Sequence, residues 1–369
     1  WSSDVCSSVR APAGNLTIEL DLQAAGNVKM PKRDTDRSQL CPCGSGKDAR
    51  ACCQRRPRDG ASAVIDAIFA DLQGAIAGGR FSSIEEAREY LNRTLKRYNE
   101  GPRDDFHGLS PHQLSRFLNH PFDSPDIVEF SSRLEAPVDA PVLTIFRALA
   151  DAIGTDGLRA TAQGNLPRVF CREAARIFNE AGHADPFFRL DRINQEADFP
   201  ELRVTRHAAM AAGLIRKYRQ RFMFVDAGRR LWTETGLTGV YPRLLRAHIQ
   251  RLQWSWADRY PELLIIQSLF LFSLYLLAKW GSSWRPAAFY ENCFLKAFPA
   301  TLDEMPAVEY GTPADIVRKC YTLRFLVRFA WFVGLVELEA MSPRYTVIPE
   351  FKVRKTSLLD QTVRFRLPV

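Results

Sequence analysis

The stretch that decides the fold of this chain is AGLIRKYRQRFMFVD, at residues 212–226. It follows a helical pattern, and its Ala-Gly pair is a typical end of a helix. LIRKY and RFMFVD are short and rich in apolar residues, and they predict two strands joined by a basic turn. A new helical pattern begins after Asp226, at Ala227 and Gly228. The segment therefore predicts a helix, a β-hairpin and a second helix in immediate succession.

The same order of elements recurs near the C-terminus, where FLVRFAWFVGLVELE (residues 325–339) runs into MSPRYTVIPEF. A weaker match to this order of elements lies within residues 141–170, where PVLTIFRALADAI precedes GLRATAQGNLPRVF. A helix, a Gly-Leu break and an aromatic hairpin are typical of a winged helix-turn-helix, because the hairpin covers the end of the last helix. The spacing between copies is not constant, which excludes a solenoid. We predict two winged-helix-like modules and a third, weaker one at residues 141–170.

The composition is that of a globular protein with a basic excess. The 369 residues include 50 Lys plus Arg and 42 Asp plus Glu, for a formal net charge of +8. The apolar share of 46% and the charged share of 25% exclude wholesale disorder, a collagen-like repeat and a multi-span membrane protein. Because the basic residues are spread along the chain, they permit contact with nucleic acid or anionic lipid without requiring it.

The most apolar run is LLIIQSLFLFSLYLLA, at residues 263–278. Its aromatic flanks, Tyr260, Trp280 and Trp284, resemble the belt of a membrane helix. However, the run is shorter than the roughly 20 residues that a bilayer core needs, and Gln267 interrupts it. A helix that is apolar on all sides is typical of the centre of a large helical domain. We predict a buried helix and no stable membrane insertion, with a membrane span as the alternative.

Three further helical patterns lie between the N-terminal region and the hairpins. They begin at Ala61, at Ser83 with Glu86 in capping-box position, and at Ser110 with Pro111 at the first helical position. The predicted fold class is mainly α with small β-hairpins. The predicted domains are a disordered leader (1–38), a cysteine knuckle (39–57), a helical segment (58–135), winged-helix-like modules (136–240) and a helical core with a C-terminal winged-helix-like module (241–369).

The origin of the first part of the leader has two interpretations. Residues 1–29 precede Met30, which is a candidate start of the native chain. The alternative is that these residues belong to a fragment of a longer protein. They lack the basic and apolar segments of a secretory signal.

Half of the eight cysteines lie in CPCGSGKDARACC, at residues 41–53. Four thiolates complete a tetrahedral Zn²⁺ site and leave no position for water, which is typical of a structural zinc site. The clustering indicates a metal site in a reducing compartment and hence a cytoplasmic protein. Disulfides and unligated thiols are the alternatives. The predicted ligands are Cys41, Cys43, Cys52 and Cys53.

This string resembles the SEC-C motif, the zinc-binding tail of the bacterial preprotein translocase ATPase, which also occurs in many otherwise unrelated bacterial proteins. The resemblance implies that the same four cysteines bind zinc. In the family, this tail contacts a chaperone, the ribosome or anionic lipid, and it carries several lysines before the last ligand pair. The present chain keeps Lys47 and Arg50 there but has Asp48 and Ala49 between them, so it departs from that basic pattern.

The remaining chain is similar to a group of uncharacterised bacterial proteins that join a SEC-C motif to helical and winged-helix-like segments. The phrases that carry this resemblance are GLSPHQLSRFLNHPFDSPD, ATAQGNLPR and GLIRKYRQRFMFVDAGRRL. The resemblance implies the same fold class, but it does not imply an activity.

Signals for catalysis are weak. GSGKD is not a phosphate-binding loop, because Lys47 is followed by Asp48 instead of Ser or Thr. His107, beside two aspartates, has neither a nucleophile motif nor a metal-ligand spacing near it. The apolar surroundings of Cys171, Cys293 and Cys320 indicate inert core thiols. No enzyme class has positive support.

The predicted wing is strongly basic. In a winged helix the second helix of the motif enters the major groove and the wing lies along phosphates, so basic residues at both places favour duplex DNA. An exposed, solvated hairpin or a protein-binding surface is the alternative. The wing carries Arg216, Lys217, Arg219 and Arg221, and the preceding helix carries Arg203, Arg206 and His207.

Together these patterns predict a zinc-containing cytoplasmic binding or adaptor protein, associated with DNA or with a protein partner. A SEC-C-mediated partner of the ribosome, a chaperone or the membrane surface is the first alternative. An unrecognised enzyme is the second.

Overall fold

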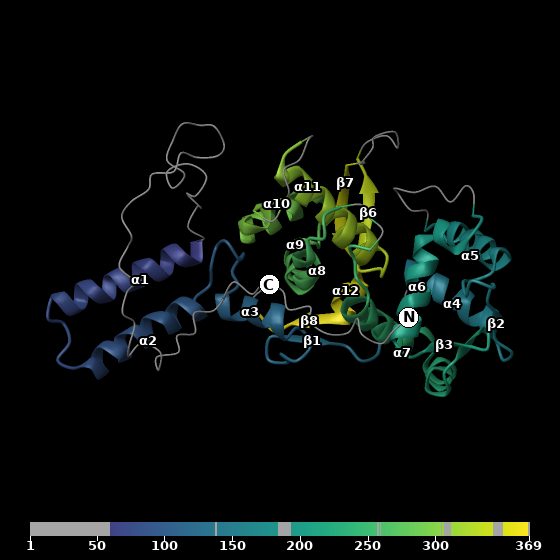
Figure 1. The fold of residues 1–369 in the computed structure, drawn as a ribbon, viewed down its shortest axis with the longest axis horizontal. Helices are drawn as coiled ribbons and strands as arrows, with labels where there is room; N and C mark the ends of the chain where they lie inside the picture. The colour runs from purple at the N-terminus through teal and green to yellow at the C-terminus, as the bar shows by residue number, and fades with distance from the viewer. Residues whose placement is uncertain are drawn as a thin grey trace, which may run out of the picture. The chain divides into compact units, whose positions relative to one another are not determined.

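The structure is a computed structural model, shown in Figure 1. The described residues group into two units, which divide between Ser115 and Arg116. The predicted leader and cysteine knuckle, residues 1–57, lie outside the described residues. The structure describes residues 60–136, 139–183, 193–256, 258, 260–303, 305, 311–341 and 350–367.

The described residues of the first unit form helices and loops, as predicted. The unit contains α1 (Gly60–Ala77) and α2 (Ile84–Glu100), and α3 (Pro111–Asn119) begins in it. The Ser83 hydroxyl caps α2 by accepting a hydrogen bond from the Glu86 backbone N–H at 3.1 Å. Ser110 and Gln113 bond reciprocally at the start of α3, at 2.9 and 3.2 Å. The helix starts that the capping signals predicted are therefore confirmed.

The predicted hairpin lies in a module of three helices and three strands (Figure 1). Its strands form one antiparallel sheet in the order β2-β4-β3. Ile215, Phe222 and Phe224 of the hairpin are buried, which seals the sheet against the helices. In chain order the elements are α4 (Pro141–Ile153), β2 (Leu158–Arg159), α5 (Arg168–Glu180), the 3₁₀ turn η2 (Glu196–Asp198), α6 (Pro200–Ala211), β3 (Ile215–Tyr218) and β4 (Arg221–Phe224).

The second unit contains the module just described and, further along the chain, the same order of elements once more. Its sheet order, β5-β7-β6, repeats β2-β4-β3, and the helical stretch before β6 takes the place of α6. The recurrence that the sequence indicated is thus a recurrence of topology. The elements are α9 (Phe270–Trp280), β5 (Arg285–Pro286), α10 (Ala287–Ala297), η3 (Pro299–Leu302), α11 (Pro313–Tyr321), the π-helix η4 (Thr322–Trp331), β6 (Val336–Ala340) and β7 (Phe351–Lys355).

The prediction of a third, separate module at residues 141–170 is wrong. Its helix is α4, and its strand β2 pairs with β4 of the first module instead of forming a hairpin of its own. The Ala160 backbone N–H donates to the Gln220 carbonyl at 2.8 Å across this pairing. A strand of two residues has too few hydrogen bonds to stand alone, so it completes the existing hairpin.

The apolar run at residues 263–278 is buried, as predicted, but it forms two helices. These are α8 (Leu264–Ser268) and α9, with Leu269 between them. The side-chain amide of Gln267 donates to the Ile249 and Leu252 carbonyls at 2.9 and 2.7 Å. The side-chain amide thus satisfies two backbone carbonyls inside the protein, which explains a glutamine in so apolar a run. Among the helices that the structure describes, none is long and apolar enough to cross a membrane.

A long helix and a strand pair tie the second unit together. The long helix α7 (Asp226–Arg251), with a kink at Gly236, follows the first module and leads toward α8. The strands β1 (Val128–Phe130) and β8 (Val363–Phe365) pair antiparallel, and α12 (Ser357–Thr362) precedes β8. This pairing joins the two ends of the unit and was not predicted. The fold is mainly α with small antiparallel sheets, which confirms the predicted class.

Candidate functional site

The hairpin β3–β4 carries all four predicted basic residues. Arg216, Lys217, Arg219 and Arg221 are all exposed. Positive φ angles at Arg219 and Gln220, 46° and 56°, give the tight two-residue turn that suits the twist of a hairpin. The guanidinium groups of Arg216 and Arg219 lie 5.5 and 5.1 Å from the ring centre of Tyr218. The tip of the hairpin is therefore an aromatic side chain between two cations.

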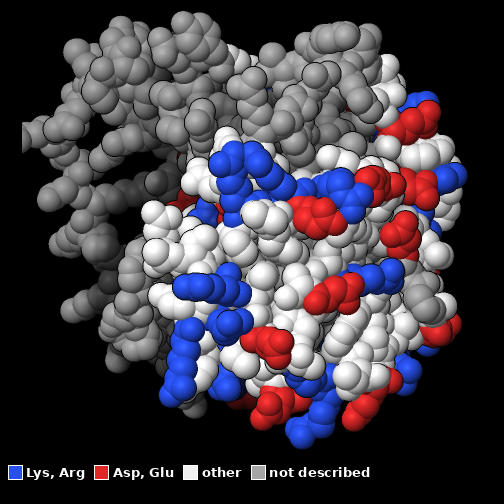
Figure 2. Space-filling view, turned by 90° about the vertical axis from the view of Figure 1, so that its right-hand side faces the viewer, with Lys and Arg blue, Asp and Glu red and all other residues white. Residues whose placement is uncertain are grey.

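The neighbouring strand adds a fifth cation that the sequence analysis missed. Arg159 of β2 is exposed and lies opposite Arg221 in the sheet. Arg221 also donates to the carbonyls of Asp156 and Gly157, at 3.2 and 2.9 Å, which holds its side chain near β2. Figure 2 shows Lys and Arg side chains gathered along the left-hand side of the view, and basic and acidic side chains mixed over the rest of the described surface.

The helix before the hairpin does not present its cations to solvent as predicted. Arg206 is 6% exposed, and its Nε donates to Glu196 Oε1 at 2.5 Å. Glu196 is buried as well and also accepts from the Leu166 backbone N–H at 2.8 Å. The prediction for Arg206 is wrong, because the sequence places it on a helix next to other cations but does not show its buried partner.

Arg203 and His207 of α6 also turn toward the protein. The Arg203 guanidinium lies 3.8 Å from the ring centre of Trp256, and the His207 ring lies 5.9 Å from it. Burial lowers the pKa of His207 to about 4, so the ring is neutral at pH 7. The face of α6 that was expected to enter a DNA groove thus packs against the segment that follows α7.

A cavity of about 370 Å³ lies beside this face of α6. Its three walls are α6, the end of α7 with the segment that follows it, and η4. The described lining residues include four arginines and one carboxylate, that of Glu201, and the charge of one of these arginines, Arg324, is balanced by the buried Asp258 carboxylate. The cavity is therefore electropositive. In the order of the three walls, the main lining residues are Arg203 and His207, Arg251 and Trp256, and Arg328 and Trp331.

The η4 wall is π-helical, which is rare in proteins and frequent at functional sites. The Phe332 backbone N–H donates to the Val327 carbonyl at 3.2 Å, a bond that spans five residues. Residues four or five apart consequently share a face. This geometry places Val327 and Arg328 with Trp331 and Phe332 along the cavity.

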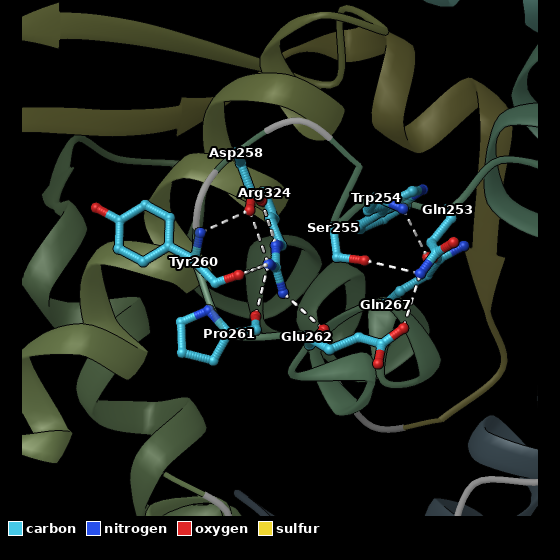
Figure 3. Close-up of polar contacts among 9 residues, drawn as sticks. All are labelled: Gln253, Trp254, Ser255, Asp258, Tyr260, Pro261, Glu262, Gln267 and Arg324. Atoms are coloured by element: carbon cyan, nitrogen blue, oxygen red, sulfur yellow. Dashed lines mark hydrogen bonds and ion pairs between the residues drawn. The ribbon is translucent and has the colours of Figure 1, made fainter. Parts of the chain in front are cut away.

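A buried ion pair fixes the same wall (Figure 3). Arg324 and Asp258 are fully buried, with Nε to Oδ2 at 2.5 Å and Nη2 to Oδ1 at 2.9 Å. The Arg324 guanidinium also donates to the carbonyls of Pro261 and Glu262, at 2.7 and 2.9 Å. The pair therefore fastens the segment before α8 to η4.

The part of the chain that the structure describes contains no cluster of three or more His, Cys, Asp or Glu suited to a metal ion. Cys171, Cys293 and Cys320 are all buried. Burial raises the pKa of all three thiols, that of Cys293 to about 11, so they are protonated and unreactive. The predicted ligands, Cys41, Cys43, Cys52 and Cys53, lie outside the described residues.

Comparison with protein families gives two matches. The model of the SEC-C motif matches residues 37–55, which include the four predicted ligands. The chain carries a SEC-C motif. The model of the Y4jL N-terminal domain matches residues 139–237, which span α4 to β4 and the first part of α7. No curated protein and no solved structure matches this chain.

A repeat in the sequence could have identified the cavity. The pattern Leu-Arg, five residues, Ala, three residues, Gly-Leu occurs at residues 202–214 and again at residues 323–335. It pairs Arg203 with Arg324 and Gly213 with Gly334. Since both arginines line the cavity, the repeat marks the helices that enclose it.

Proposed function

We propose that this chain is a DNA-associated binding protein, with a winged-helix module at residues 139–225 and a zinc ion in its SEC-C motif. The observation that carries the proposal is the exposed hairpin, with four cations at the end of a module whose helix and strand order resembles that of a winged helix. The fifth cation, Arg159, lies on the same sheet. A cluster of this kind is suited to phosphate oxygens.

The arrangement favours contact with the DNA backbone over the reading of bases. Arg206 is paired with Glu196, and Arg203 is stacked on Trp256, so the helix α6 has few groups to offer a base edge. Backbone contacts carry no sequence information directly. We therefore expect weak binding with little sequence preference and a strong dependence on salt.

Replacing Arg216 and Arg219 together by glutamine tests the hairpin. The two exposed side chains would each lose one phosphate contact, so the slope of log affinity against log salt should fall by about 2. Fluorescence anisotropy of a labelled duplex over a salt series measures it. The matched control is Arg88→Gln with Arg93→Gln on α2, which removes the same charge from exposed sites in the other unit. Absence of binding at low salt, or equal slopes for both variants, would refute the proposal.

Replacing Cys43 by serine tests the zinc site. Purified protein should contain one zinc ion per chain, and Cys43→Ser should remove it, because a closed site of four thiolates loses one of its ligands. Elemental analysis of the dialysed protein gives the stoichiometry. Cys6→Ser, outside the SEC-C match, is the control and should retain the zinc. Zinc-free wild-type protein would contradict the assignment.

A further inference from the structure

The cavity lies between the equivalent helices of the two repeated modules. Arg203 of α6 and Arg324 of η4 occupy matching positions in the repeated pattern, and both line it. Arg324 is held by Asp258 and by backbone carbonyls, so it is part of the wall. Arg203 has an aromatic ring beside it in place of a carboxylate. The repeat thus supplies one structural arginine and one that keeps its positive charge toward the cavity.

Further cations surround the same space. Arg251, at the end of α7, is exposed, and no carboxylate pairs with it in the described part of the chain. Arg328 extends from η4. Arginine has a planar group of several donors that matches a carboxylate or a phosphate in a bidentate manner. Arg203 and Arg251 therefore provide two positive charges to which an anion can bind.

Aromatic side chains form much of the remaining lining. Three of the seven tryptophans in the chain line the cavity, namely Trp254, Trp256 and Trp331. The Trp254 ring is fixed by stacking on Phe329, with centroids 4.4 Å apart. Rigid indole walls provide flat apolar surface for a planar ring. The volume of about 370 Å³ lies within the roughly 300–1,000 Å³ that is typical of sites for small molecules.

We propose that this cavity binds a small anion that carries a planar ring, with a nucleoside monophosphate as its representative. The arginines at the cavity hold the anionic group, and the ring lies against the indole wall. The cavity is too small for duplex DNA, and none of its residues belongs to the hairpin β3–β4, so the proposal does not depend on the DNA-associated function.

The test is a binding titration of the full chain followed by tryptophan fluorescence. Adenosine monophosphate and guanosine monophosphate are the nucleotide probes, and indole-3-carboxylate is the probe for a ring that carries a carboxylate. At least one of them should give a saturable change. Adenosine alone and inorganic phosphate alone should bind at least about tenfold more weakly than the best anion, because each provides only part of the contacts. Which probe binds best identifies the anionic group.

Arg251→Ala should weaken this binding by about tenfold, the loss of one charged contact. Arg243→Ala is the matched control, because it is an exposed arginine of the same helix that does not line the cavity. Thermal unfolding midpoints of both variants should equal that of the wild type, which separates loss of binding from loss of fold. The hairpin variant Arg216→Gln with Arg219→Gln should bind the anion normally, whatever its effect on DNA.

Several results would overturn the proposal. One is the absence of saturable binding by every ring-bearing anion up to millimolar concentration. Another is equal affinity for inorganic phosphate and for the best nucleotide. An equal loss of affinity in Arg251→Ala and Arg243→Ala would also overturn it, because the anion would then bind outside this cavity.

Discussion

Replacing Arg324 by alanine should lower the free energy of unfolding of the second unit by about 3–5 kcal/mol, because one member of a buried ion pair is removed. The Asp258 carboxylate, fully buried, would lose both of its bonds to the guanidinium. The carbonyls of Pro261 and Glu262 would lose their donor as well. Urea unfolding followed by circular dichroism measures the change.

Two companion variants make this prediction specific. Arg176→Ala removes an arginine that pairs with Glu173 and Glu180 on the surface of α5, so it should change stability little. Arg324→Met combined with Asp258→Asn removes the isolated buried charge, so the double variant should lose less stability than the two single losses added together. If Arg324→Ala is as stable as Arg176→Ala, the ion pair does not hold the segment before α8.

Replacing Gly334 by alanine should destabilise the protein more than the same change at its repeat partner, Gly213. Both glycines have positive φ, 85° and 68°, where a Cβ costs about 1–2 kcal/mol. A Cβ on Gly334 would also lie 2.6 Å from the Cβ of Ala140, which is fully buried. This crowding should add about 1–3 kcal/mol. A Cβ on Gly213 would meet no atom within 4 Å.

The pair of glycine variants is its own control. Both positions end the helical stretch before a hairpin and take the same substitution, so the difference in unfolding free energy isolates the crowding at Ala140. Equal losses, measured in the same urea titration, would show that the chain moves to admit the extra methyl group.

The sequence alone determined the parts of this protein that depend on neighbouring residues. The hairpin β3–β4 follows from an apolar pattern on both sides of a two-residue turn, and its partners are close in the chain. Ser83 and Ser110 cap the next helices through residues three positions away. The SEC-C motif is a local string as well, and its four cysteines were evident from their spacing.

The tertiary structure decided which charged groups meet solvent and which face one another. Arg206 and Arg216 look alike as basic residues in the sequence, yet Arg206 is buried against Glu196 and Arg216 is exposed on the hairpin. Arg324 forms an ion pair with Asp258, which lies on a segment far away along the chain. Burial and partner choice depend on how helices pack, and that packing depends on shape and apolar surface over the whole unit. The cavity between α6 and η4 exists for the same reason, because only the packing of the two modules brings their equivalent helices to one space.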